Sequence, residues 1–148
     1  MVAAAKLNPN LSKHVAVNTK LDMPIEIVAD KLRITQLLGN IIGNAAKFTR
    51  SGNITVESHV HLKENEIEIR IIDTGSGIPD DIFPDLFEKF STKRSSGNDQ
   101  SGTSLGLFIS KAIVLAHGGQ ISASNNNQSE MTFFILLPIN GNKLLGGD

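Results

Sequence analysis

The sequence contains no cysteine, so the chain forms neither disulfides nor thiolate metal sites, and this is typical of a reducing compartment. It has no apolar run near the roughly 20 residues that a membrane helix needs, and its MVAAAK start lacks the apolar middle of a signal peptide. Neither sign of charge is in excess, with 14 Lys and Arg against 15 Asp and Glu. We therefore expect a soluble, cytoplasmic and monomeric segment that contacts neither membrane nor nucleic acid. We expect it to belong to a longer parent protein, which could itself be membrane-anchored.

The 148 residues fit one compact domain, and the residue patterns predict its elements. Asp30 is the expected N-cap of one helix, and Gly118 with Gly119 is the expected C-cap of another. The predicted strands span residues 14–22, 25–30, 53–62, 66–73, 120–124 and 132–138, and the predicted helices 31–49, 81–90 and 105–117. This order indicates an α+β two-layer sandwich, a mixed sheet of about five strands covered on one face by about three helices. We expect the parts to be a lead segment 1–13, the domain 14–139, and a tail or linker 140–148.

One predicted helix carries residues that are unfavourable in helices. The stretch QLLGNIIGNAAKFT, residues 36–49, holds two Asn and two Gly. Each Asn costs roughly 0.5 and each Gly about 1 kcal/mol relative to Ala in a helix interior. Helical periodicity gives the helix one polar stripe beside a broad apolar face, made of Arg33, Gln36, Asn40, Asn44 and Lys47. A solvated flank would favour Glu, Lys and Gln over Asn, whereas amide oxygens ligate Mg2+ and Lys neutralises phosphate, so the stripe indicates a metal and phosphate site.

Two glycine-containing segments offer further polar groups. In DTGSGIP, Asp73 stands where a strand leaves the sheet, and Gly75 and Gly77 follow. A tight turn with a capping acid would explain this pattern. Alternatively, the glycines admit a planar ring and the carboxylate accepts a hydrogen bond from an exocyclic amine, which selects adenine over guanine. In SGTSLGLFIS, Gly102 and Gly106 stand at a predicted helix start, where free N–H groups favour a phosphate.

A polar loop, residues 91–104, precedes that helix. Loops of this length inside compact domains are usually functional or disordered. Lys93 and Arg94 are either solvated loop charges or the basic part of a lid that closes over nucleotide phosphates.

Taken together and in this order, these segments resemble the catalytic, ATP-binding domain of sensor histidine kinases. That domain belongs to a superfamily shared with type II topoisomerases, heat-shock chaperones and mismatch-repair ATPases. QLLGNIIGNAAKFT resembles the family's N box, DTGSGIP its first glycine box, LFEKF its F box and SGTSLGLFISKAIVLAHGG its second glycine box. The resemblance covers residues 18–138 and implies a Bergerat-type ATP-binding fold, protein-histidine kinase activity, and the cofactors ATP and Mg2+.

The resemblance also implies roles for single residues. Asn44 would ligate Mg2+, Asn40 would help position the metal and the phosphates, and Lys47 would contact phosphate. Asp73 would bind the adenine amino group. The other nucleotide-binding positions implied are Gly75, Gly77 and Ile78 at the base pocket, Phe87 and Phe90 at the pocket and lid hinge, Lys93 or Arg94 above the phosphates, Gly102, Thr103, Ser104, Leu105, Gly106 and Leu107 at the phosphates, and Thr132 in the last strand.

The identity of Asn40 separates branches of the superfamily. Hydrolysing relatives carry a Glu there as general base on water, and a carboxamide has no useful basicity near neutral pH. The resemblance thus implies slow hydrolysis and transfer of the γ-phosphoryl to a histidine. None of this chain's own histidines lies in the family's helical context of His followed by an acid, so we expect structural roles for His14, His59, His61 and His117. His117 stands at the end of a predicted helix, where the helix dipole favours its charged form. The phosphoacceptor would lie on a separate dimerisation domain, and the phosphate would pass indirectly to a response-regulator receiver domain.

Two positions depart from the family pattern. Ser104 replaces the middle Gly of Gly-x-Gly-Leu-Gly, and it would cost roughly 1 kcal/mol or more if that position needs a positive φ. Glu130 and Met131 stand where the family often has Gly-Thr, with Thr132 one residue late. Two alternatives therefore stay open: a degenerate nucleotide-binding or docking module, and an ATP-hydrolysing or serine-phosphorylating member of the same superfamily.

Overall fold

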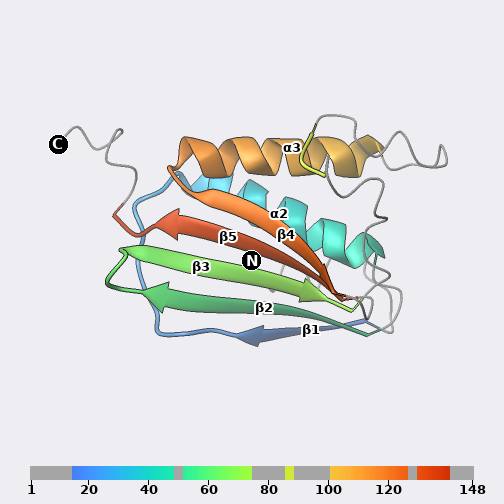
Figure 1. Cartoon of the computed structure of the whole chain (residues 1–148), viewed down its shortest axis with the longest axis horizontal. Coiled ribbons are helices and arrows are strands. Elements are labelled where there is room, and N and C mark those ends of the chain that lie inside the picture. Colours follow the sequence, from blue (N-terminus) through green and yellow to red (C-terminus); the bar gives the residue numbers. More distant parts are fainter. Residues whose placement is uncertain (1–14, 49–51, 75–85, 89–100, 127–129, 141–148) are drawn as a thin grey trace.

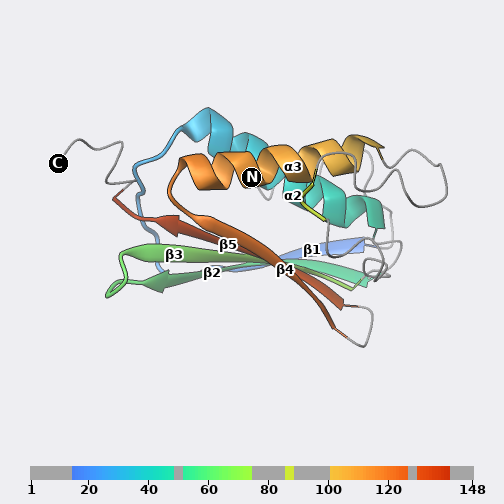
Figure 2. The same cartoon turned by 45° about the horizontal axis from the view of Figure 1, so that its top comes forward.

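A computed structural model describes residues 15–48, 52–74, 86–88, 101–126 and 130–140. Within these residues, a five-stranded sheet carries both helices on one face, as Figures 1 and 2 show from two directions. The elements are β1 (Val15–Lys20), α2 (Lys31–Phe48), β2 (Gly52–His61), β3 (Glu66–Asp73), α3 (Ser101–Ala116), β4 (Gln120–Asn126) and β5 (Glu130–Pro138).

The sheet is mixed, with the strand order β1-β2-β3-β5-β4. The edge strand β1 pairs in parallel with β2, and the other neighbouring strands pair antiparallel. A parallel pair needs a crossover connection, which α2 provides, whereas β2 and β3 form the predicted hairpin. The predicted α+β two-layer sandwich around a mixed sheet is therefore confirmed.

Strand alternation separates a covered face of the sheet from an open one. Val56, Ile71 and Phe133 lie opposite one another on β2, β3 and β5, and they are buried in one cluster with Leu37 and Ile41 of α2. Full burial of such an aliphatic side chain is worth about 1.5–3 kcal/mol. The apolar face of α2 thus outweighs the poor helix propensity of its Asn and Gly residues.

The predicted helix caps are present. The backbone N–H of Arg33 donates to Oδ1 of Asp30 at 3.2 Å, so Asp30 is the N-cap of α2. Gly118 follows α3 with a φ of 76°, the left-handed conformation of a helix C-cap. A side chain at Gly119 would collide with the backbone oxygen of Leu136, so this turn also needs glycine for the close approach of β5.

The strand predicted over residues 25–30 is wrong, because the segment has no strand conformation. The N–H of Val28 donates to the oxygen of Ile139 at 2.9 Å, just past the end of β5. The segment connects the edge of the sheet to the helix layer (Figure 1), and its Ile27 packs against the core. The apolar alternation therefore reflects packing without a neighbouring strand.

The helix predicted from residue 105 begins earlier, at Ser101. Of the aromatic helix predicted over residues 81–90, the structure describes only residues 86–88, which form a turn. The predicted lead segment and nearly all of the predicted tail lie outside the described residues. Where the chain is described, neither helix is both long and apolar enough to cross a membrane.

Candidate functional site

Three segments that carry predicted site residues end on the same side of the molecule. The C-terminal end of α2, the C-terminal end of β3 and the N-terminal end of α3 all lie at the right in Figure 1. Helix α2 also contacts both β3 and α3. The fold therefore brings together the polar stripe of α2, the carboxylate that ends β3, and the first turn of α3.

Asn44 is the buried member of the polar stripe. It is only 7% exposed, and its Oδ1 has no hydrogen-bond partner in the described part of the chain. An unpaired buried acceptor costs about 1–3 kcal/mol, and native proteins keep few of them. An amide oxygen is a ligand that Mg2+ accepts. Asn44 therefore fits the predicted role of a metal ligand.

Asn40 lies one turn earlier and has a partner. Its Nδ2 donates to the backbone oxygen of Gly106 in α3 at 3.3 Å, and the hydroxyl of Ser110 donates to the same oxygen at 2.7 Å. A Cβ added at Gly106 would lie 3.8 Å from Cγ of Asn40, an ordinary contact distance. The two amides of the stripe thus have different surroundings, since Asn40 joins α2 to α3, whereas Oδ1 of Asn44 lacks a partner among the described residues.

Asp73 is the last residue of β3 and is 3% exposed. It lies opposite Ile54 on β2 and Met131 on β5, on the face that the helices cover. On the same face, the Phe87 ring meets the Phe133 ring edge to face, with centroids 6.2 Å apart. These positions fit the predicted base pocket, in which Asp73 contacts the adenine amino group and Phe87 supports the ring.

The start of α3 differs from the prediction in which N–H groups it leaves free. Only the first turn of a helix has unpaired N–H groups, and in α3 this turn contains Gly102 and Thr103. Gly106 and Leu107 follow in the second turn, where backbone N–H groups bond within the helix. Phosphate contacts through free N–H groups are therefore expected from Gly102 and Thr103. Ser104 also has helical backbone, so it bears no positive-φ cost.

The side chains of Leu105 and Leu107 have structural surroundings. Leu107 is 1% exposed and belongs to the core, whereas Leu105 is 38% exposed on the outside of α3. Neither side chain therefore offers a polar group to the predicted phosphate site, and the backbone N–H groups of both residues bond within α3.

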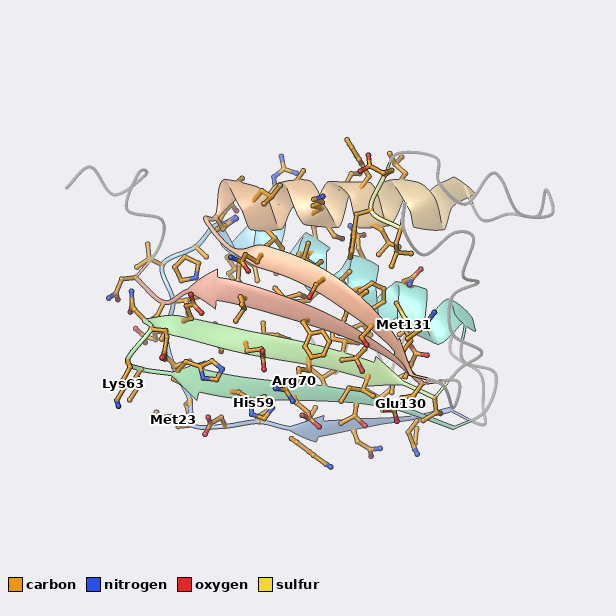
Figure 3. The ribbon with its side chains drawn as sticks, in the orientation of Figure 1. Met23, His59, Lys63, Arg70, Glu130 and Met131 are labelled. Carbon is orange, nitrogen blue, oxygen red and sulfur yellow. The ribbon has the colours of Figure 1, made fainter. Side chains whose placement is uncertain are left out.

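Thr132 lies on the other face of the sheet from Asp73. The register places it opposite Ile72 and Ser124, one position out of phase with the Asp73–Met131 pair. Figure 3 shows the neighbouring Met131 at this end of the sheet. The structure therefore does not bring Thr132 together with the other predicted base-pocket residues.

Several predicted site residues lie outside the described residues: Gly75, Gly77, Ile78, Phe90, Lys93 and Arg94. The backbone of Lys47 continues α2 one turn after Asn44 and two turns after Asn40. Its side chain is outside the description, as are those of Gly102, Thr103 and Ser104.

Two histidines have surroundings that fit structural roles. His117 shares a hydrogen bond with the oxygen of Ile113 through Nδ1 at 2.8 Å, and its Nε2 accepts the N–H of Asp30 at 3.1 Å. On the open face, Nε2 of His59 contacts Oε1 of Glu57 at 3.1 Å (Figure 3).

The same open face carries a second polar contact away from the site. The Nε of Arg70 donates to Oε1 of Glu68 at 2.7 Å, and its guanidinium lies 5.6 Å from the ring centroid of Phe134. The Arg70 side chain thereby covers the apolar Phe134 ring on the face of the sheet that the helices leave open.

Sequence reasoning missed the contact of Ser110 with Gly106. A serine inside an apolar helix gives no signal of its own beyond being polar.

Comparison with known proteins identifies the family. The model of the histidine kinase-, DNA gyrase B-, and HSP90-like ATPase family matches residues 29–141. Signal transduction histidine-protein kinase BarA of Escherichia coli (strain K12) is 37% identical over 139 residues, which cover 90% of this chain and 15% of BarA. Sensor histidine kinase GacS of Pseudomonas protegens is 37% identical over 120 residues, which cover 78% of this chain and 13% of GacS.

Solved structures agree with these relatives. The crystal structure of full-length ShkA in complex with AMPPNP superposes with a TM-score of 0.77 at 25% identity, covering 95% of this chain and 29% of ShkA. The mycobacterial sensor histidine kinase MprB superposes with a TM-score of 0.72 at 25% identity, covering 87% of this chain and 86% of that structure. The chain therefore belongs to the histidine kinase-, DNA gyrase B- and HSP90-like ATPase family, as an ATP-binding catalytic domain of the sensor histidine kinase type.

Proposed function

We propose that residues 14–139 form a domain that binds Mg-ATP where α2, β3 and α3 meet, and that donates the γ-phosphoryl to a histidine on a separate dimerisation domain. The buried Oδ1 of Asn44, which lacks a partner in the described ranges, carries the proposal, because a bound Mg2+ would satisfy this oxygen. The relatives BarA and GacS are named as histidine kinases, and ShkA was solved with AMPPNP, which supports the same reaction class.

Each site residue has a task in this reaction. Asp73 accepts a hydrogen bond from the adenine amino group, and Asn44 with Asn40 holds the metal and the phosphates. Lys47 contacts phosphate from the following turn of α2. Asn44 and Asn40 would hold Mg2+, which would supply charge neutralisation at the phosphates. The domain positions the γ-phosphoryl so that its bond to the bridging oxygen breaks as a bond to an imidazole nitrogen forms, and ADP leaves.

Slow hydrolysis follows from the carboxamide of Asn40. A water molecule needs a general base to attack efficiently, and an amide cannot accept its proton near neutral pH. The γ-phosphoryl is thereby kept for an imidazole, which is itself nucleophilic when neutral. A response-regulator receiver domain would then take the phosphate from that histidine and has no need to touch this domain.

The outer face of α3 supports docking of the histidine-bearing domain. Leu105 and Phe108 are each 38% exposed and Leu115 is 56% exposed, and Ala112 lies between them at helical spacing. Surface helices usually carry charged residues on this side, and contiguous exposed apolar residues mark interaction sites. Docking here would place the acceptor histidine beside the helix start that faces the phosphates.

Ligand-dependent melting tests the nucleotide site. Mg-ATP at 100 times its Kd should stabilise the domain by about 2.7 kcal/mol. Asn44→Ala should abolish the Mg2+-dependent part of this gain, and Asp73→Asn should lower the affinity for ATP. Asn18→Ala on the exposed edge strand is the matched control and should change neither. If Asp73→Asn binds ATP as the wild type does, Asp73 is not in the base pocket.

Phosphotransfer tests the reaction itself. The isolated chain should release phosphate from ATP slowly, and adding a histidine-containing dimerisation domain should produce an acid-labile phosphohistidine on that domain. Steady phosphate release at about 1 s⁻¹ or faster would favour a hydrolase. Failure of millimolar Mg-ATP to raise the melting temperature would favour a degenerate docking module.

A further inference from the structure

Ser110 is a buried polar residue to which the mechanism above gives no task. Within the described residues, the buried polar side chains are Asn44, Asp73, Ser110 and Thr132. Asn44 and Asp73 belong to the proposed nucleotide site. Ser110 is 0% exposed in the middle of α3, on a helix whose other buried residues are apolar.

The hydrogen bonds around Gly106 link Ser110 to that site. A helical serine commonly bonds back to the carbonyl four residues earlier, and this contact alone would only satisfy its hydroxyl. The same oxygen, however, also accepts Nδ2 of Asn40 from the neighbouring helix. The serine contact, 2.7 Å, lies in the middle of the usual O–H···O range, whereas the amide contact, 3.3 Å, lies beyond the usual N–H···O range. Of the two side-chain donors to this carbonyl, Ser110 is thus the closer.

The shared carbonyl also decides how the Asn40 carboxamide is turned. A carboxamide has a donor nitrogen at one end and an acceptor oxygen at the other. If Asn40 were flipped, its Oδ1 would face the oxygen of Gly106, and two acceptors repel. Gly106 therefore holds the nitrogen, and Oδ1 lies at the opposite end of the carboxamide, where it suits a cation or a cation-bound water.

We propose that Ser110 is a positioning residue of the nucleotide site. Its hydroxyl holds the Gly106 carbonyl in place, the carbonyl holds the nitrogen of Asn40, and the oxygen of Asn40 is thereby presented to the metal. Ser110 itself touches neither metal nor nucleotide. This inference rests on the proposed binding of Mg-ATP, and it extends the site to a side chain within α3.

A matched pair of variants isolates the hydroxyl. Ser110→Thr keeps it, and Ser110→Val has nearly the same shape without it, so both bear the same packing cost at this buried position. The readout is the ratio of the Kd for ATP in EDTA to the Kd for ATP in Mg2+. We expect Ser110→Thr to keep the wild-type ratio and Ser110→Val to lower it about two- to tenfold, the range for loss of one hydrogen bond. A merely structural role would lower the melting temperature of both variants and leave the ratio unchanged.

Two further measurements keep the test decisive. Ser110→Ala removes the hydroxyl without adding volume and should show the same loss if Ser110→Val does not fold. In the ligand-free protein, the side-chain amide NMR signals of Asn40, assigned by their loss in Asn40→Ala, should shift in Ser110→Val and not in Ser110→Thr. Equal ratios in the Val and Thr variants, with Mg2+ dependence intact in the wild type, would overturn the inference and leave the proposed function standing. No Mg2+ dependence in the wild type would instead refute the proposed function.

Discussion

Replacing Asn44 by alanine should stabilise the ligand-free domain and weaken its complex with Mg-ATP. The opposite signs arise because Oδ1 of Asn44 is buried without a partner in the described part of the chain. This oxygen lowers the free energy of unfolding until a cation binds it. Alanine removes the oxygen, and it is also a better helix former than Asn in the interior of α2.

The size of the effect follows from three contributions. Relief of an unpaired buried acceptor is worth about 1–3 kcal/mol, and the gain in helix propensity about 0.5 kcal/mol. Deleting the amide opposes these gains by leaving a cavity of roughly 40 Å3, which costs about 1 kcal/mol. The net gain is about 0.5–2.5 kcal/mol, and at roughly 4 °C per kcal/mol for a domain of this size it raises the melting temperature by about 2–10 °C.

Calorimetric melting with and without Mg-ATP measures both signs. At 100 times the Kd, the wild type should gain about 2.7 kcal/mol, or about 11 °C on the same scale. Asn44→Ala should keep only the gain that ATP gives in EDTA. The control Thr35→Ala lies at an exposed position of the same helix and should retain the full Mg2+-dependent gain. A lower ligand-free melting temperature in Asn44→Ala would refute the unpaired-oxygen argument, and an undiminished Mg2+ effect would refute the metal assignment.

Two other changes test separate parts of the structure. The Asp22 carboxylate accepts the N–H of Val60 and the N–H of Met23, and these bonds, Val60 first, hold its pKa below the usual range. Asp22→Asn should therefore lower the free energy of unfolding above about pH 4. The difference from wild type, measured by urea titration, should vanish as the pH falls through the lowered pKa of Asp22 in the folded state. A difference that persists at about pH 2 would contradict this prediction. Gly106→Ala should fold, since the added Cβ would lie 3.8 Å from Cγ of Asn40, an ordinary contact distance. Weaker nucleotide binding by the folded variant would show that the ligand needs the glycine. Unfolding of the variant would contradict the contact distance.

The sheet and α2 were predictable because their signals are local. Alternation in EIEIRIID identifies a strand with one buried face, and the structure buries Ile71 and Asp73 on that face. Asp30 and Gly118 identify helix ends because each residue type satisfies a specific backbone need there. Such features depend on neighbours within a few residues, so the sequence carries them without knowledge of the fold.

The errors occur where tertiary contacts decide. Residues 25–30 have the apolar alternation of a strand, but a strand also requires a neighbour to pair with, and this segment lies between the two layers. The first turn of α3 contains Gly102 and Ser104, which favour loops, yet the helix includes both. Thr132 was implied as a nucleotide-binding position by the resemblance to the family's last strand, and the strand register places it opposite Ile72, on the other face of the sheet from Asp73.

The site shows the same division between residue type and residue role. Asn40 and Asn44 were identified because asparagine is a poor choice inside a helix, and that signal treats both alike. The resemblance assigns them different roles, and the fold gives them different surroundings: Nδ2 of Asn40 donates to a carbonyl of α3, whereas Oδ1 of Asn44 is buried without a partner among the described residues. The stability that this site costs is supplied by the opposite side of α2, where Leu37 and Ile41 are 0% exposed in the core. A truncation of either residue should therefore lower ligand-free stability without touching the nucleotide, whereas a change at Asn44 should raise stability only by giving up the metal.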